Sequence, residues 1–212
     1  IWPSSFKGST IASLDLTKYT KITSIGSYAF QNAKITSAAL NNVDEIFDNA
    51  FDTCPINIEF SKTKLKNIHN YAFKGSEITP TDQIFPNTLK LIGQKAFYET
   101  KLTSIVLSKN DNELKIDQSA FENVITLVQA TIHAKNIESE AFSGCVNMRA
   151  TEITIEGSGN IKTNAFNNCY NLSCKLTVAP AKDKKPNDQT ISKFSKINKN
   201  SLSSKKKRNL YK

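Results

Sequence analysis

The stretch Ile92-Gly93-Gln94-Lys95-Ala96-Phe97 carries the pattern Ile-x-x-x-Ala-Phe, which returns along the whole chain. The pattern also spans residues 25–30, 46–51, 68–73, 116–121, 137–142 and 161–166, and residues 1–6 carry an eighth copy with Ser5 in place of alanine. Self-similarity at a fixed period predicts a protein of stacked repeats. The phenylalanines that end the copies lie 21 to 24 residues apart, at Phe6, Phe30, Phe51, Phe73, Phe97, Phe121, Phe142 and Phe166.

A second periodic feature lies between the phenylalanines, a short segment that alternates apolar and other residues. Such alternation predicts a β-strand with one buried and one exposed face. Repeats of about 23 residues leave little room for a helix of ordinary length. The sequence therefore predicts about eight β-dominated repeats, in which the apolar segments end at Leu16, Leu40, Phe60, Leu107, Ile132, Ile155 and Val178, with Phe85 at this position in the irregular third repeat.

Stacking is what such repeats require, because one repeat cannot bury its apolar face alone. We expect continuous ladders of Ile, Phe and Leu, with parallel pairing between strands of successive repeats. Burial of each phenylalanine should contribute about 1.5–3 kcal/mol.

The phrase Ile92-Gly93 followed by Ala96-Phe97 resembles the BspA-like leucine-rich repeats. Cys54, Cys145 and Cys169 each follow a repeat phenylalanine by three residues, where that family often has cysteine. The resemblance covers residues 1–179 and implies a leucine-rich-repeat solenoid of the α/β horseshoe class, with a parallel sheet on its inner face. The chain departs from the family pattern in keeping the glycine after Ile only at Gly26 and Gly93.

Charge divides the chain in two. It carries 28 basic and 19 acidic residues, and residues 180–212 hold 11 of the basic and 2 of the acidic ones. Residues 1–179 are therefore neutral, with 17 of each sign. We expect 1–179 to form the solenoid, truncated at its N-terminus, and 180–212 to form a disordered basic tail, since its Lys- and Ser-rich composition buries little apolar surface. No apolar run approaches the ~20 residues of a membrane span.

The four cysteines leave three alternatives open. Cys145 and Cys169 occupy equivalent positions in adjacent repeats and could form a disulfide if their Cα atoms lie within ~7 Å. Cys169 with Cys174 is a second candidate pair, and a buried free thiol is the third alternative. A metal site is not predicted, because Cys54 stands alone and no histidine lies near a cysteine in the sequence.

Catalytic patterns are missing from the sequence. His69 and His133 lie beside no recognisable nucleophile, and none of the seven glycines forms a phosphate-binding loop; we interpret Gly157-Ser158-Gly159 as a turn within a repeat. The sequence therefore predicts a protein that is not an enzyme and has no cofactor, metal or small-molecule substrate.

The exposed face of the strands is the predicted protein-binding site. Residues between and before the apolar strand positions should point outward. They include Ser13, Ser37, Asn57, Ser104, Gln129 and Lys175. Ile84 and Val106 should form an apolar patch on a polar, mildly acidic face. The candidate contact residues are Asp15, Ala39, Glu59, Asp82, Ile84, Val106, Thr131, Glu152, Thr154 and Thr177.

The basic run Lys205-Lys206-Lys207-Arg208 has four interpretations: a nuclear address, a nucleic-acid contact, a contact for anionic membranes, or a solvated tail. The family resemblance implies a surface or secreted adhesin-like protein that attaches to host or extracellular-matrix proteins. The alternative hypothesis is an intracellular scaffold whose tail contacts nucleic acid or an anionic membrane.

Overall fold

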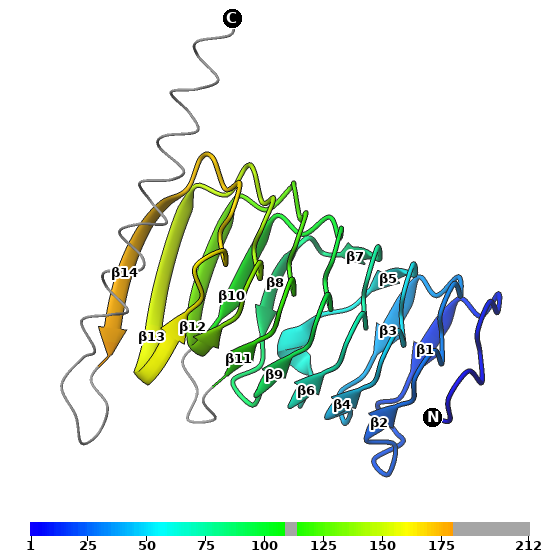
Figure 1. Ribbon diagram of the computed structural model, residues 1–212. Helices are drawn as coiled ribbons and strands as arrows, with labels where there is room; N and C mark the ends of the chain where they lie inside the picture. The colour runs from blue at the N-terminus through cyan, green and yellow to red at the C-terminus, as the bar shows by residue number, and fades with distance from the viewer. Residues whose placement is uncertain (109–113, 180–212) are drawn as a thin grey trace, which may run out of the picture.

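The computed structural model describes residues 1–108 and 114–179. They wind into coils that stack side by side (Figure 1), so the expected solenoid is confirmed. Within these residues the helical content is the single 3₁₀ turn η1, Phe60–Lys62. The strands are β1 Ser13–Asp15, β2 Ser24–Ile25, β3 Ser37–Ala39, β4 Glu45–Ile46, β5 Pro55–Asn57, β6 Asn67–Ile68, β7 Glu77–Thr79, β8 Asp82–Phe85, β9 Leu91–Ile92, β10 Ser104–Leu107, β11 Lys115–Ile116, β12 Gln129–Ile137, β13 Ala150–Ile161 and β14 Ser173–Ala179.

Each coil crosses a parallel ladder that we call the back ladder, formed by β2, β4, β6, β9, β11 and the ends of β12 and β13. The isoleucine that opens each sequence repeat lies in register with its neighbours, and its side chain is buried. Because isoleucine recurs at this position in every coil, its side chain packs against the same residue type at each step. These residues are Ile25, Ile46, Ile68, Ile92, Ile116, Ile137 and Ile161.

The repeat phenylalanines form a second ladder inside the coils. Neighbouring rings are stacked with centroids 5.0–5.3 Å apart and planes within 3–9°. Phe6, in the first coil, is 38% exposed, whereas Phe30 to Phe142 are fully buried. Tight turns aim these rings inward: at Phe51, for example, Asn49 and Thr53 adopt the left-handed conformation with φ of 55° and 58°. This ladder confirms the stacking that the spacing predicts.

Glycine follows isoleucine where two coils approach closely. A β-carbon at Gly93 would lie 2.7 Å from the carbonyl carbon of His69. Such a distance excludes any side chain unless the backbone shifts. In other coils larger residues such as Phe47 take this position.

The cysteines are free thiols, so neither candidate disulfide forms. Three of them donate across to the phenylalanine carbonyl of an earlier coil: Cys54 to Phe30, Cys145 to Phe121 at 3.2 Å, and Cys169 to Phe142 at 3.0 Å. Ser76 occupies the same position and donates to the carbonyl of Phe51 at 2.5 Å. In these four coils the position therefore holds a small buried donor that ties two coils together, and the third alternative is the one observed.

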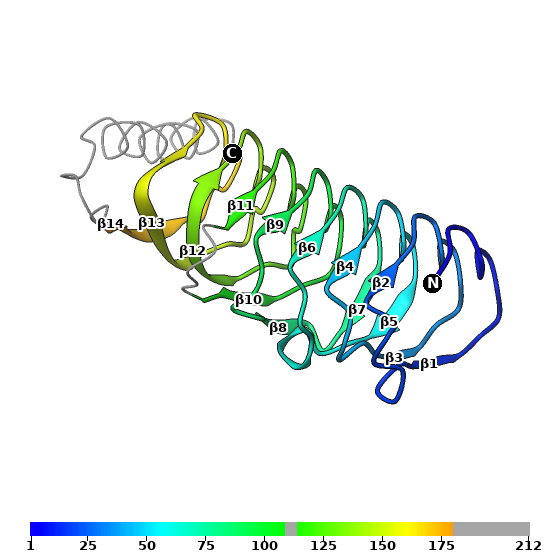
Figure 2. The same cartoon turned by 90° about the horizontal axis from the view of Figure 1, so that it is seen from below.

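The front of the coils carries the second set of strands, which we call the front sheet. It consists of three pieces: β1 with β3, β5 with β7, and the run β8, β10, β12, β13, β14, which joins the back ladder through β12 and β13 (Figure 2). All pairings are parallel, as expected.

One break in the front sheet separates the pair β5 and β7 from the run that begins at β8, and it falls in the irregular repeat. The prediction of a strand ending at Phe60 is wrong. The strand there is β5, and Phe60 begins η1 instead. Ile58 follows buried Ile56 by two positions, whereas Gln83 follows Ile78 by five, so adjacent coils cannot stay in register. The amide of Gln83 bridges the gap: it donates to the carbonyl of Ile58 at 3.0 Å and accepts from the backbone N–H of Phe60 at 3.3 Å.

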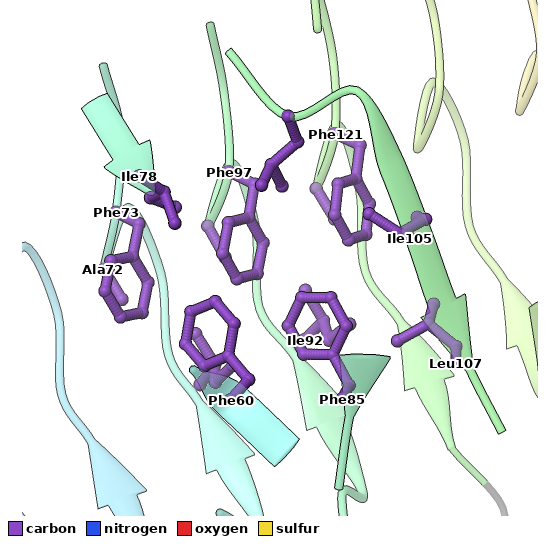
Figure 3. Packing of buried hydrophobic residues seen from close by; sticks show 14 of the residues in the cluster. Phe60, Ala72, Phe73, Ile78, Phe85, Ile92, Phe97, Ile105, Leu107 and Phe121 are labelled. Atoms are coloured by element: carbon purple, nitrogen blue, oxygen red, sulfur yellow. The ribbon is translucent and has the colours of Figure 1, made fainter. Parts of the chain in front are cut away.

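Two additional phenylalanine rings fill the core at this break (Figure 3). Phe60 and Phe85 stack at 4.8 Å, and their edges meet the rings of Phe73 and Phe97 at 5.3–5.8 Å. Large apolar side chains thus replace the leucines that occupy this slot in regular coils, such as Leu40 and Leu107.

The last coils follow a different course, because β12 and β13 run from the front sheet into the back ladder as continuous strands. The turn expected at residues 157–159 is therefore wrong. Ala134 pairs with Ile155 and Asn136 pairs with Asn160, so β13 has more residues than β12 between these two pairs. The pairing of the two strands is irregular at this point. The expected alignment also slips by two residues, because Ile132 pairs with Ile153 rather than with Ile155.

Candidate protein-binding face

The front sheet from β8 to β14 brings several predicted contact residues into one row. The register places Ile84 beside Val106, Val106 beside Thr131, Thr131 beside Glu152, and Glu152 beside Lys175. Ile84 is 56% exposed, Glu152 and Lys175 are exposed, and Val106 and Thr131 are half-buried. We call this row the contact row. It is apolar at one end and charged at the other.

A hollow of about 380 Å³ lies over this part of the sheet. It spans four strands, and residues of the contact row form much of its lining. The hydroxyl of Thr151 in the lining is buried and has no hydrogen-bond partner. Thr151 lies on the buried side of β13, as Ile153 does, so this hydroxyl is not presented to a ligand in the hollow. The lining residues are Ser104, Ile105, Val106, Gln129, Ala130, Thr131, Thr151, Glu152, Ser173 and Lys175.

Other predicted contact residues lie outside the contact row. Asp82 is exposed and pairs with Ser104 in the adjacent row. Thr154 and Thr177 are neighbours in a third row, with His133 on the other side of Thr154.

The two residues Asp15 and Ala39 lie side by side, but in the separate sheet of β1 and β3. Thr17 donates its hydroxyl and its backbone N–H to the Asp15 carboxylate, and these hydrogen bonds lower the pKa of that carboxyl. This part of the front face therefore presents a fixed negative charge.

Glu59 does not lie on a strand, which corrects the expected placement. It precedes η1, and its carboxylate pairs with the ammonium of Lys62 at 2.9 Å. The short connection from Ile56 to Ile58 moves the strand to residues 55–57 and leaves Glu59 in the following turn. Its side chain is exposed but does not join the contact row.

Sequence reasoning did not single out Thr151, because it precedes a segment of regular alternation and carries no unusual residue type. No local signal marks it, since its burial depends on the pairing of β13 with both neighbours. The expected alignment already places Lys175 beside Glu152, whereas the pairing of Thr131 with Glu152 depends on the two-residue slip. The basic run Lys205-Lys206-Lys207-Arg208 lies outside the described residues.

His69 belongs to a network of side chains that connects two neighbouring coils. His69 Nε2 lies 2.6 Å from a carboxylate oxygen of Glu45, and its ring stacks on Phe47 at 4.7 Å. The other oxygen of Glu45 accepts from the amide of Asn67 at 2.6 Å. This network links β4 to β6, and His69 therefore helps to hold two neighbouring coils together.

Two further features concern the part of the chain that the structure describes. No group of three or more His, Cys, Asp or Glu side chains there has the geometry of a metal site. Nor does this part contain a helix with the length and apolarity of a bilayer span.

Comparison with family models identifies the repeat. The family model described as "BspA type Leucine rich repeat region (6 copies)" matches residues 1–123 and 56–173. A leucine-rich repeat protein from Eubacterium ventriosum, whose crystal structure was determined at 2.50 Å, is 15% identical with a TM-score of 0.47 over 84% of this chain. The chain spans 57% of the length of that protein. No curated protein matches the chain significantly.

Proposed function

The chain belongs to the BspA-type leucine-rich repeat family, and we propose that it is a non-enzymatic module that binds a protein partner through the contact row. Repeat proteins of this kind build extended binding surfaces from side chains that recur in successive coils. The observation that carries the proposal is the row from Ile84 to Lys175 together with the hollow of about 380 Å³ beside it.

The chemistry of the row describes the segment that it would accept. Ile84 and Val106 offer an apolar surface to an aliphatic or aromatic side chain of the partner. The hydroxyl of Thr131, which is half-buried, offers hydrogen bonds in the middle of the site. Glu152 next to Lys175 favours a polar or charged end of the partner segment over an apolar one.

The partner class follows from the family. We propose a cell-surface or secreted, adhesin-like protein whose partner is a host or extracellular-matrix protein, because this is what membership of the family implies. The alternative, an intracellular scaffold whose tail contacts nucleic acid or an anionic membrane, depends on Lys205-Lys206-Lys207-Arg208.

A matched pair of substitutions tests the contact row. Ile84 and Ile125 have nearly equal exposed fractions, 56% and 55%, but Ile125 lies in the connection before β12 and outside the contact row. Ile84→Glu should weaken binding of the full chain to extracellular-matrix proteins at least tenfold, because it places a charge in the apolar end of the site. Ile125→Glu should change binding less than about twofold, since exposed substitutions away from a contact have small effects. Surface plasmon resonance at about 0.15 M and 0.5 M salt measures both.

The same assay separates the face from the tail. A third variant replaces Lys205, Lys206, Lys207 and Arg208 with glutamine. Binding that survives this change at high salt but falls with Ile84→Glu supports the contact row. Binding that disappears in the tail variant and is equal in the two isoleucine variants contradicts it and supports the alternative function.

A further inference from the structure

One edge of the solenoid concentrates positive charge. The connections that lead from the front of the coils into β2, β4, β6 and β9 are residues 17–23, 41–44, 61–66 and 86–90. They form the lower edge in Figure 1. They contain six lysines and one acidic residue, Asp44, and Glu59 lies just before the third of them, although residues 1–179 as a whole are neutral. We call this surface the lysine edge, and its lysines, all exposed, are Lys18, Lys21, Lys62, Lys64, Lys66 and Lys90.

Backbone hydrogen bonds hold these connections in register. The N–H of Lys66 donates to the carbonyl of Asp44 at 2.8 Å, and the N–H of Lys90 donates to the carbonyl of Lys66 at 2.7 Å. The ammonium of Lys64 donates to the side-chain oxygen of Asn42, one coil earlier, at 3.3 Å. Successive coils lie about 4.8 Å apart, as neighbouring strands do. Lys66 and Lys90 therefore occupy equivalent positions in neighbouring coils, while the coil between Lys21 and Lys64 contributes Asn42 and Asp44 instead of a lysine.

A depression of about 310 Å³ lies between these connections. Its polar lining consists of hydroxyl, amide, carboxylate and ammonium groups, and Tyr19, 60% exposed, lies in the first of the same connections. The lining residues are Thr20, Thr23, Asn42, Asp44, Lys64, Lys66 and Thr88.

Much of the positive charge has no local counter-ion. Lys66 pairs with Asp44 at 3.0 Å, and Lys62 pairs with Glu59. Lys64 contacts a neutral amide, and Lys21 and Lys90 make no ion pair within residues 1–108 and 114–179. Clustered charges of one sign raise the local concentration of oppositely charged ligands.

We propose that the lysine edge binds a sulfated polysaccharide that lies along the stacked coils. The ammonium groups of Lys21, Lys64 and Lys90 would contact sulfate groups. Threonine hydroxyls and the Asn42 amide would contact sugar hydroxyls, and the Tyr19 ring would offer an apolar platform to one sugar. Nucleic acid fits less well, because single-stranded binding uses a series of aromatic side chains for base stacking and these connections have Tyr19 alone.

Heparin is the probe for the test, with the full chain and two matched triple variants. The edge variant carries Lys21→Gln, Lys64→Gln and Lys90→Gln. The control variant carries Lys7→Gln, Lys34→Gln and Lys162→Gln, which removes the same charge from exposed lysines elsewhere. At about 0.15 M salt the edge variant should lose at least tenfold in heparin affinity and show a shallower salt dependence, because fewer counter-ions are released. The control variant should change less than about threefold.

Further arms identify the ligand and exclude the tail. Chemically desulfated heparin should bind at least tenfold more weakly than heparin. Tyr19→Ala should weaken heparin binding and leave the binding of a single-stranded oligonucleotide unchanged. The variant with Lys205, Lys206, Lys207 and Arg208 replaced by glutamine should retain the tenfold difference between edge and control variants.

Three results would overturn the proposal: equal losses in the edge and control variants, equal affinity for desulfated heparin, or oligonucleotide binding as tight as heparin binding and equally dependent on the edge lysines. The inference is independent of the contact row. Ile84→Glu should leave heparin binding unchanged, and the edge variant should leave binding of the protein partner unchanged, so failure of one proposal does not imply failure of the other.

Discussion

The phenylalanine ladder and the front sheet run through the same coils, but only the ladder is regular. Its rings stack at 5.0–5.3 Å from Phe6 to Phe166, whereas the front sheet breaks into three pieces. At the break, Phe60 and Phe85 add rings to the core, and the Gln83 amide replaces backbone pairing. The difference indicates that the stacked rings and the back ladder hold the coils at one spacing, while the front strands follow the length of each connection.

The strongest test of this comparison removes one ring from the middle of the ladder and one from its end. Phe97 is fully buried between two rings, whereas Phe6 is 38% exposed and stacks on one. Phe97→Ala should lower the free energy of unfolding by about 3–5 kcal/mol, because it leaves a cavity. Phe6→Ala should cost about 1 kcal/mol, since less area is buried. Urea denaturation followed by circular dichroism measures both changes in the free energy of unfolding. Equal changes for the two variants would contradict the larger contribution of a ring in the middle of the ladder.

A second test concerns the break in the front sheet. Gln83 is 2% exposed, and Gln83→Leu keeps its volume while removing hydrogen bonds to Ile58, Pro80 and Phe60. Leaving buried polar groups without partners should cost about 1–3 kcal/mol. Gln129→Leu is the matched control, because Gln129 is exposed, and should change stability by less than about 0.5 kcal/mol. Hydrogen exchange should also accelerate at the Phe60 amide in the Gln83 variant; unchanged exchange there would argue against the bridge.

The third test compares equivalent positions in adjacent coils, Cys54 and Ser76. Burial raises the pKa of the Cys54 thiol from its ordinary value of 9.0 to about 12. Between these values the unfolded chain loses the proton and the folded chain keeps it, so the folded state becomes less stable as pH rises. One pH unit above 9, this thiol should lower stability by about 1.4 kcal/mol.

Cys54→Ser should therefore reduce the loss of stability between pH 8 and pH 10 by about 1.4 kcal/mol, since a serine donates from this position without titrating there, as Ser76 does. Ser76→Cys should increase the loss by a similar amount. Urea denaturation of the three proteins at both pH values measures the difference. Equal pH dependence in all three would mean that the thiol at this position is hydrated.

Sequence reasoning was sufficient for the parts of the fold that repeat identically. The isoleucines of the back ladder and the stacked phenylalanines recur at a nearly constant spacing, so local pattern and packing lead to the same structure. The outward direction of Ile84 and Val106 was predictable for a related reason, because alternation along a strand assigns each side chain to a face.

Tertiary structure decided the features that depend on the exact register between coils of different length. The pairing of Ile132 with Ile153 rather than Ile155 could not be predicted, because a two-residue slip leaves every side chain on the same face. Glu59 does not lie on the front sheet, because the short segment from Ile56 to Ile58 moves the strand to residues 55–57 and leaves Glu59 before η1. The lysine edge exists only once residues 17–23, 61–66 and 86–90 are stacked, since charges far apart in sequence act together only when the coils bring them close.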